Sequence, residues 1–319
     1  MAEWLVEQGI GEERALLVEG EQAIAARLEW PGGLAAGQIE DAVLTHFDSA
    51  RRRGTARFGN GAEALVDRLP ADSREGAPVR LEVTRAAIAE RGRLKRAQAR
   101  PSEAALRPAP SLVETLAGTI IRRFPVGLWE DVWAEAWSGE VAFASGSLLF
   151  AVTPAMTLVD IDGGAAPAAL AREAVAPLAL ALRRFDLGGS IGVDFPSLAR
   201  KEDRRTVDMA LGEALADWPH ERTAMNGFGF VQLVARLERP SLLHRLTLAR
   251  AGAAARMLMR RAEHAEEPGT LLLTAHPAVA AQLSEAWLAE LARRTGREVR
   301  LASDPALALD SGFAQAVPR

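Results

Sequence analysis

The first thirty residues hold short apolar segments separated by turn-forming residues. Apolar runs of roughly four to eight residues bounded by glycine or proline are typical of β-strands. The sequence therefore predicts two strands joined by a turn, Trp4–Gln8 and Arg14–Glu19, followed by a third, Ile24–Glu29. Pro31-Gly32-Gly33 then ends the pattern, because these residues favour a turn.

Residues 37–90 alternate apolar and polar side chains over short segments, which is the period of a strand with one buried face. The predicted strands are Gln38–Phe47, Gly54–Phe58, Ala62–Val66 and Val79–Thr84. Gly59-Asn60-Gly61 is a strong signal for a tight turn. Closely spaced short strands with at most one helix indicate a small barrel of the OB type.

Helical patterns follow a linker at residues 101–111 that is rich in proline, alanine and serine. Ser111–Phe124 has the pattern of an amphipathic helix. In Leu128–Trp137 a tryptophan recurs every four residues, which places the three indole rings on one face of a helix. We expect these rings to pack in the core.

A strand–helix–strand pattern occupies the middle of the chain. Met156–Asp162 is apolar until its carboxylates, and Ser190–Phe195 follows a Gly188-Gly189 turn. Between them, Ala168–Phe185 has the pattern of an amphipathic helix. This order is typical of an α/β layer in which the two strands are neighbours.

Asp160 and Asp194 occupy similar positions on these two strands. A carboxylate within an apolar strand is costly unless something compensates it, and two close carboxylates repel each other. A divalent cation removes this repulsion, and Mg²⁺ suits a site with few carboxylate ligands and several waters. Such a site supports metal-assisted hydrolysis of a phosphodiester. Because an aspartate at a strand end also commonly caps a helix or a turn, the residues alone leave both roles open.

The composition is that of an ordinary globular protein, with 319 residues, 49% of them hydrophobic and 25% charged. The net charge of -4 means that contact with a nucleic acid would need a local basic patch or a bound cation. The chain has no cysteine, which excludes disulfides and thiolate metal sites and fits a reducing compartment. We expect neither a signal peptide nor a membrane span, and we predict a cytoplasmic protein.

The stretch from Arg85 to Arg100 is the most basic in the chain. Its cations are Arg85, Arg91, Arg93, Lys95, Arg96 and Arg100. One interpretation is a stripe that contacts the phosphates of a nucleic acid. The other, which we favour slightly on these residues alone, is a solvated strand or helix face that leads into the linker.

At the acidic strands the sequence resembles the ribonuclease E/G family. The family's first acidic strand, D-L-G-G turn and second acidic strand are matched by Val159–Asp162, Asp186–Gly189 and Val193–Phe195. Weaker matches occur in the expected order on both sides, at Ser145–Phe150, Phe228-Gly229 and Arg239–Leu242. The resemblance extends over most of the chain, and its central part is the specific one.

The resemblance implies an α/β (α+β) fold of several subdomains, with a ribonuclease H-like and deoxyribonuclease I-like catalytic core and an inserted OB-fold β-barrel. The implied divisions are 1–36 for the N-terminal strands of the core, 37–100 for the OB-fold RNA-binding domain, 101–154 for the ribonuclease H-like part, 155–252 for the deoxyribonuclease I-like subdomain and 253–319 for a small C-terminal α/β domain. In this last part Gly269–Ala275 and Gly296–Leu301 are expected to be strands, and Pro277–Thr295 largely helical. Residues 242–253 are expected to pass directly into it.

The resemblance also implies a function: a Mg²⁺-dependent endoribonuclease that cleaves single-stranded RNA and leaves 5′-phosphate and 3′-hydroxyl ends. Asp160 and Asp194 take the position of the catalytic metal ligands. Asp162 stands where the family has an asparagine that assists the metal. The expected RNA contacts are Arg57, Phe58, Arg93, Lys95, Arg205, Arg236 and Arg239.

Several family features are absent. Without the paired cysteines that bind zinc between subunits, a homodimer is compatible with the sequence only if it forms without a cysteine–zinc link. The segment before Leu128 is too short for the family's 5′-phosphate sensor. In the barrel, Arg57 and Asp67 stand at the positions of aromatics that stack on RNA bases. These departures keep a second interpretation open, namely a catalytically weak or inactive RNA-binding or regulatory protein with the same fold.

Overall fold

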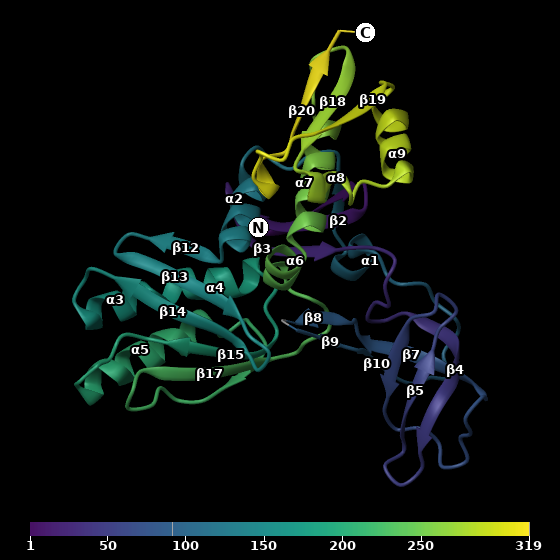
Figure 1. Ribbon diagram of the computed structural model, residues 1–319. Coiled ribbons are helices and arrows are strands. Elements are labelled where there is room, and N and C mark those ends of the chain that lie inside the picture. Colours follow the sequence, from purple (N-terminus) through teal and green to yellow (C-terminus); the bar gives the residue numbers. More distant parts are fainter. Residues whose placement is uncertain (91, 319) are drawn as a thin grey trace.

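The computed structural model describes residues 1–90 and 92–318, so Arg91 of the basic stretch lies outside the described residues. Figure 1 shows a β-barrel at the lower right, a six-stranded sheet with helices at the lower left and a smaller sheet at the top. A four-stranded N-terminal sheet lies between these regions. The protein is therefore a mixed α/β structure with a closed five-stranded barrel.

The N-terminal sheet has the strand order β11-β1-β2-β3. Its strands are β1 Glu3–Gly9, β2 Glu12–Glu19, β3 Gln22–Glu29 and β11 Thr119–Ile121. The three predicted N-terminal strands are confirmed, but the helix predicted over Ser111–Phe124 is wrong, because α1 spans only Leu112–Leu116. Ala117 ends α1 in a left-handed conformation with φ 48. The β-branched residues that follow Gly118 favour a strand, and they pair in parallel with β1.

The barrel closes in the order β10-β6-β5-β4-β7. Its strands are β4 Ile39–Asp48, β5 Arg53–Arg57, β6 Glu63–Val66, β7 Pro78–Arg85 and β10 Ala97–Pro101. Apolar side chains from these strands fill an interior that is separate from the main core of the molecule. The four strands predicted in this region are confirmed, and the closed barrel is compatible with an OB fold.

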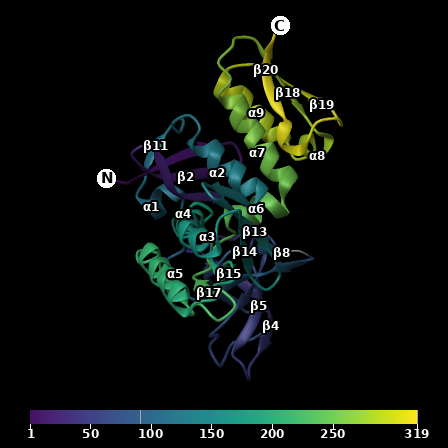
Figure 2. The same ribbon diagram turned by 90° about the vertical axis from the view of Figure 1, so that its left-hand side faces the viewer.

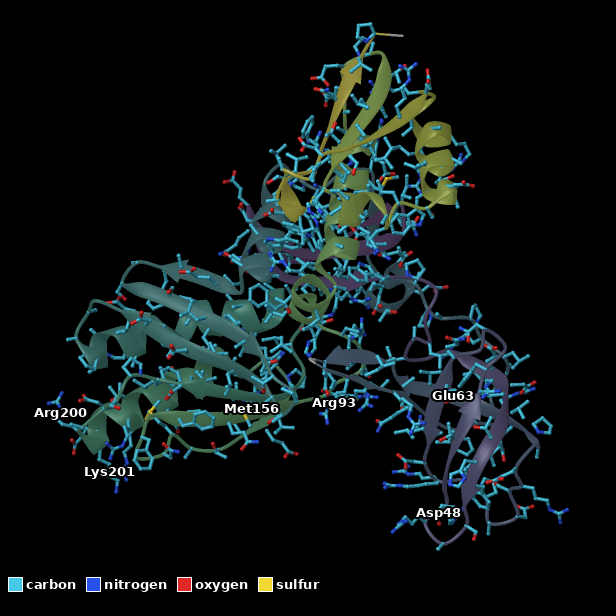
Figure 3. All side chains as sticks on the ribbon, in the orientation of Figure 1. Asp48, Glu63, Arg93, Met156, Arg200 and Lys201 are labelled. Carbon is cyan, nitrogen blue, oxygen red and sulfur yellow. The ribbon has the colours of Figure 1, made fainter. Side chains whose placement is uncertain are left out.

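A short hairpin between barrel strands β7 and β10 extends from the barrel and contacts the region of the six-stranded sheet. It consists of β8 Ile88–Glu90 and β9 Arg93–Lys95. Arg93 Nη2 donates a hydrogen bond to the carbonyl oxygen of Pro154 at 2.7 Å, and Figure 3 shows Arg93 beside Met156 at this junction. The side chain of Ile88 is buried there. The middle of the basic stretch therefore forms structural contacts between two regions of the molecule.

The six-stranded sheet has the order β12-β13-β14-β15-β17-β16. Its strands are β12 Glu140–Phe143, β13 Gly146–Val152, β14 Thr157–Gly163, β15 Gly189–Asp194, β16 His220–Arg222 and β17 Phe230–Ala235. The associated helices are α2 Leu128–Ser138, α3 Pro167–Glu173, α4 Val175–Arg184 and α5 Lys201–Ala214. Figure 2 shows α3, α4 and α5 on one side of this sheet. The helix predicted over Ala168–Phe185 is divided into α3 and α4, because Pro177 has no N–H to bond the carbonyl oxygen of Glu173.

The C-terminal region contains a three-stranded sheet in the order β19-β18-β20. Its elements are α6 Leu242–Leu248, α7 Arg250–Glu263, β18 Thr270–Ala275, α8 Pro277–Ala280, α9 Glu285–Thr295, β19 Val299–Ser303, the 3₁₀ helix η1 Leu309–Ser311 and β20 Phe313–Val317. Residues 242–253, predicted to pass directly into this region, form α6, which Ser241 caps, and the beginning of α7. The strand predicted at Gly296–Leu301 corresponds to β19, but β20 comes after it and pairs with β18.

One apolar core connects the N-terminal sheet, the six-stranded sheet and the C-terminal helices. Trp129, Trp133 and Trp137 are all buried in it, which confirms their predicted role in packing. Trp133 and Trp137 stack with their ring centroids 4.7 Å apart. Within residues 1–90 and 92–318, no helix is long and apolar enough to cross a membrane.

Candidate metal centre

Asp160 on β14 and Asp194 at the end of β15 are paired directly across two parallel strands. Both residues are exposed. Neighbouring strands lie about 4.8 Å apart, and paired residues point to the same face of a sheet. The predicted proximity of the two aspartates is therefore confirmed.

The sequence alternation decides which face these carboxylates occupy. Val159, Ile161 and Val193 are buried in the core on the helix-covered face. Because side chains alternate along a strand, Asp160 and Asp194 point to the opposite face, which no helix of this sheet covers in Figure 2. Solvent and a ligand can therefore reach both carboxylates.

The D-L-G-G turn explains why β15 arrives in this register. Asp186 and Gly189 both have positive φ values, 51 and 81. A Cβ at Gly188 would lie 2.5 Å from the carbonyl oxygen of Arg236, so only glycine fits the close approach of the two chains. Asp186 also pairs with Arg27, at 3.1 Å. These contacts give the motif a structural role in placing Asp194.

Asp162 lies on the same face as Asp160 but further along β14, opposite Ser147. Its Oδ1 accepts a hydrogen bond from the N–H of Gly163 at 2.9 Å, so it also ties down the turn that follows. Within the part of the chain that the structure describes, no three acidic or histidine side chains form a cluster that could hold a metal ion. The structure thus brings together two of the three predicted metal ligands.

Two adjacent exposed carboxylates fit a Mg²⁺ ion. This ion is commonly bound in proteins by one or two carboxylates, while waters and phosphate oxygens of a substrate complete its octahedral shell. The open face beside Asp160 and Asp194 leaves access for such ligands. The same pair does not fit Zn²⁺, because a zinc site requires three or four protein ligands that include histidine or cysteine in most cases.

The barrel residues predicted to bind RNA are less available than expected. The side chain of Phe58 is only 3% exposed and belongs to the barrel interior, so it cannot stack on a base in this structure. That prediction was wrong because Phe58 follows β5 with its ring directed into the apolar core. Arg57 is exposed, but its Nη2 donates to Glu63 Oε1 at 3.0 Å.

Two predicted contacts on the β8–β9 hairpin share one carboxylate. Arg93 and Lys95 both form ion pairs with Glu90, the latter at 2.9 Å. The pKa of Glu90 is lowered although its burial acts in the opposite direction, because these two cations bond to it. Figure 3 places Arg93 near Met156, which precedes β14. Strand β14 runs away from Met156, so the hairpin cations lie at the end of the sheet where β14 begins. The opposite end, where the parallel strands β14 and β15 finish, is called the carboxyl edge below.

The last three predicted contacts differ from one another. Arg239 is largely buried among Glu29, Asp186 and Glu238, so it is a structural tie and not a free cation. Arg236 is exposed and pairs with Glu238 at 2.9 Å. Arg205 on α5 is exposed, and its side chain has no ion pair within the described residues.

Sequence reasoning missed Lys201 at the start of α5. The loop after Asp194 leads directly into this helix, and Figure 3 shows Arg200 and Lys201 at the end of the sheet farthest from the barrel. Arg200 pairs with Asp203 at 2.8 Å, whereas the side chain of Lys201 has no ion pair in the described chain. The available signal was that the chain has only two lysines, and one of them follows an acidic strand by seven residues.

A cavity lies elsewhere, between the N-terminal sheet and the C-terminal region. Its volume is about 760 Å³, and it is lined by charged side chains that include Arg14, Arg122 and Glu263. Neither Asp160 nor Asp194 lines it. The candidate metal centre is therefore an exposed strand edge and not a deep pocket.

No family model matches the chain. Its sequence is similar to ribonuclease G of Escherichia coli (strain K12), with 30% identity over 191 residues that cover 51% of this chain and 39% of the relative. Ribonuclease G of Salmonella typhimurium (strain SL1344) is 31% identical over 192 residues, with the same two coverages. The match thus spans 39% of the length of these relatives. This similarity supports a distant relationship to the ribonuclease E/G family.

Proposed function

We propose that the protein is a Mg²⁺-dependent endoribonuclease that cleaves single-stranded RNA to 5′-phosphate and 3′-hydroxyl ends. The observation that carries this proposal is the direct pairing of Asp160 with Asp194 on neighbouring parallel strands, with both carboxylates exposed. The similarity to ribonuclease G supports a reaction on RNA. A turn-capping role alone explains neither the shared face of the two aspartates nor their access to solvent.

When bound, Mg²⁺ supplies a Lewis acid for a phosphate oxygen and lowers the pKa of a water that can then attack. Asp160 and Asp194 provide two anionic ligands and keep the remaining positions open to water and RNA. Asp162 lies on the same face and would orient a water of the site. Lys201 and Arg205 add exposed positive charge in the first half of α5, the helix that follows β15, and this charge would attract the RNA backbone.

The finer assignments of the fold belong to the same proposal. The N-terminal sheet with 101–154 would form a ribonuclease H-like part, 155–252 a deoxyribonuclease I-like subdomain, 37–100 an OB-fold domain and 253–319 a small C-terminal domain. The closed barrel supports the third of these. A homodimer without a cysteine–zinc link and a cytoplasmic location remain predictions from the sequence.

A second candidate function is RNA binding or regulation with little catalysis. The observation that favours it is that the described chain offers two clustered carboxylates and no third metal ligand beside them. The paired state of Arg57, Arg93 and Lys95 gives it no further support, because these cations would be needed for binding as well.

Cleavage of a fluorogenic single-stranded RNA distinguishes the two functions. Purified protein is incubated with the RNA in Mg²⁺ or in EDTA, beside Asp160→Asn, Asp194→Asn and the matched control Glu221→Gln, an exposed carboxylate on β16. We expect Asp160→Asn and Asp194→Asn each to lower the cleavage rate by about a hundred-fold or more, because each removes one of two anionic ligands. The Glu221 variant should cleave like the native chain.

Ligation and sequencing of the products then tests the polarity of the ends. Cleavage that persists in EDTA, or equally in both aspartate variants, would contradict the metal mechanism. Tight RNA binding without any Mg²⁺-dependent cleavage would establish the second function instead.

A further inference from the structure

The loop before β17 is held rigidly at the carboxyl edge of the sheet. The N–H of Met225 donates to Asp208 Oδ1 on α5 at 3.0 Å. The side chain of Asn226 closes the tip, because its Oδ1 accepts hydrogen bonds from the N–H groups of Phe228 and Phe230 at 2.8 and 3.0 Å. The backbone of the loop is therefore fixed before any ligand arrives.

This loop returns directly beside the acidic pair. The N–H of Phe195 donates to the carbonyl oxygen of Gly229 at 3.2 Å, and Phe230 is the register partner of Asp194. The backbone of Phe228 lies two residues from that partner, a span of at most about 7 Å. Phe228 itself is 83% exposed. A large aromatic ring is thus presented to solvent on the loop that returns beside the strand end carrying Asp194.

An apolar patch formed by Phe230, Met156 and Leu158 adjoins the loop on the open face of the sheet. Phe230, Met156 and Leu158 converge over Gly192, where an added Cβ would lie 2.5 Å from Phe230 Cζ, 2.9 Å from Met156 Sδ and 3.0 Å from Leu158 Cδ2. Leu158 remains exposed. Because a single exposed apolar residue needs no explanation, it is the continuity of this patch with Phe228 that indicates a binding surface.

The barrel does not offer an equivalent surface. Phe58 lies in its interior, and Phe47 packs partly buried against the same core. In the described part of the barrel, no aromatic side chain is among the exposed large hydrophobic residues. The exposed phenylalanine that an RNA strand could stack on is therefore at the sheet and not at the barrel, where the exposed ring is the imidazole of His46.

We propose that Phe228 forms a nucleobase-binding site: its ring stacks on a base of single-stranded RNA next to the phosphate at Asp160 and Asp194. This inference rests on the proposed function, since it needs RNA to pass the acidic pair. Every base has a π-face, so the site contributes affinity without strong sequence preference. Phe230 and Leu158 exclude water on the sheet side of the stacked base.

The test measures stacking separately from cleavage. The probe is a short single-stranded RNA that carries 2-aminopurine, whose fluorescence is quenched on stacking, titrated into the Asp160→Asn/Asp194→Asn protein in EDTA. This double substitution prevents cleavage and removes the repulsion between the carboxylates and the RNA. We expect quenching, and we expect Phe228→Ala to abolish it and to weaken binding about ten-fold, within the range for one stacked base.

Two further variants define the result. Phe228→Trp should retain both the quenching and the affinity, because indole also stacks. Phe313→Ala is the matched control, since it removes an exposed phenylalanine from β20 in the C-terminal sheet. We expect this variant to bind like its parent.

The outcomes separate this proposal from the proposed function. If Phe228→Ala and Phe313→Ala bind and quench alike, or if the parent shows no quenching, the nucleobase site is overturned whatever the cleavage assay shows. If quenching depends on Phe228 but the native chain does not cleave RNA in Mg²⁺, the site stands and the endoribonuclease proposal fails.

Discussion

The barrel and the main body of the molecule, which is everything that shares the large apolar core, both contain many ion pairs between an arginine and a carboxylate. The pairs on the barrel are exposed to solvent, whereas several in the main body are buried. On the barrel, Arg80 Nε lies 2.9 Å from Asp41 Oδ1, and the two side chains are 38% and 52% exposed. In the main body, Arg14 Nη2 lies 2.6 Å from Glu7 Oε1, and these side chains are 1% and 4% exposed. The same two kinds of residue therefore have very different energetic consequences in the two regions.

The difference shows which charges are structural and which are available to a ligand. Barrel pairs are solvated and contribute little to stability, but they neutralise the cations that would otherwise meet RNA. Buried pairs hold the main body together, because removal of one partner leaves an uncompensated charge. At the carboxyl edge of the six-stranded sheet, Lys201 and Arg205 belong to neither group.

The largest effect is expected at the buried pairs. Glu7 contacts both Arg14 and Arg260, and its Oε2 also accepts the N–H of Phe124 at 3.1 Å. Glu7→Gln leaves two buried guanidinium groups without this counter-charge, so we expect it to lower the free energy of unfolding by about 3–5 kcal/mol. Denaturation in urea, followed by circular dichroism, measures this change.

A matched substitution on the barrel tests the other half of the comparison. Glu63→Gln removes the partner of exposed Arg57, and we expect no measurable change in the free energy of unfolding. Equal destabilisation by the Glu7 and Glu63 variants would show that burial does not separate the two regions in the way described.

The contact between the β8–β9 hairpin and α6 is expected to make the stability of the protein depend on pH. His244 on α6 is half-buried beside the β8–β9 hairpin, and its Nδ1 shares a hydrogen bond of 2.7 Å with Ser241 Oγ. Burial lowers the pKa of His244 from 6.5 to about 4, and Lys95 and Arg245 act in the same direction against Glu90. The folded protein therefore keeps this imidazole neutral in weak acid.

The sign of the effect follows from proton binding. Below pH 6.5 the unfolded chain takes up a proton at His244, whereas the folded chain does so only near pH 4, so the stability falls as the pH falls between these values. The shift corresponds to about 3 kcal/mol at most. Unfolding in urea at several pH values should show a shallower dependence for His244→Gln. An identical pH dependence in both proteins would contradict this assignment.

Local patterns predicted much of the fold. The three N-terminal strands, the barrel strands and the two acidic strands follow from alternation and turn residues, and the pairing of Asp160 with Asp194 follows from equivalent positions on neighbouring strands. The helix predicted over Ser111–Phe124 failed because its second half pairs with β1, more than a hundred residues away in the sequence. A long-range strand partner leaves no signal in the local pattern.

The same limit applies to the predicted site residues. Arg239 and Phe58 have the residue types that bind RNA, but one is enclosed by Glu29, Asp186 and Glu238 and the other by the barrel core. Phe228 is the opposite case, because it belongs to a recognised motif but its exposure depends on the fold of the loop. Whether a side chain forms an ion pair or is buried depends on the tertiary structure, so it cannot be predicted from the local sequence pattern.

The smallest change that we expect to be measurable is the most direct test of the comparison, because it concerns cations alone. Lys201→Ala/Arg205→Ala removes two unpaired charges at the carboxyl edge, and Arg53→Ala/Arg57→Ala removes two that are paired on the barrel. Both double variants change the net charge by the same amount, so their general electrostatic effect on RNA is matched.

We expect the sheet variant to bind single-stranded RNA about ten-fold more weakly, and its plot of log affinity against log salt to be shallower by about 1.4, the value for two lost phosphate contacts. An arginine that must first leave its carboxylate gains less from a phosphate, so the barrel variant should change both quantities less. A larger loss in the barrel variant would place the RNA path on the barrel after all. In that case the ion pairs seen there would open on binding, and the unpaired cations of α5 would be ordinary surface charges.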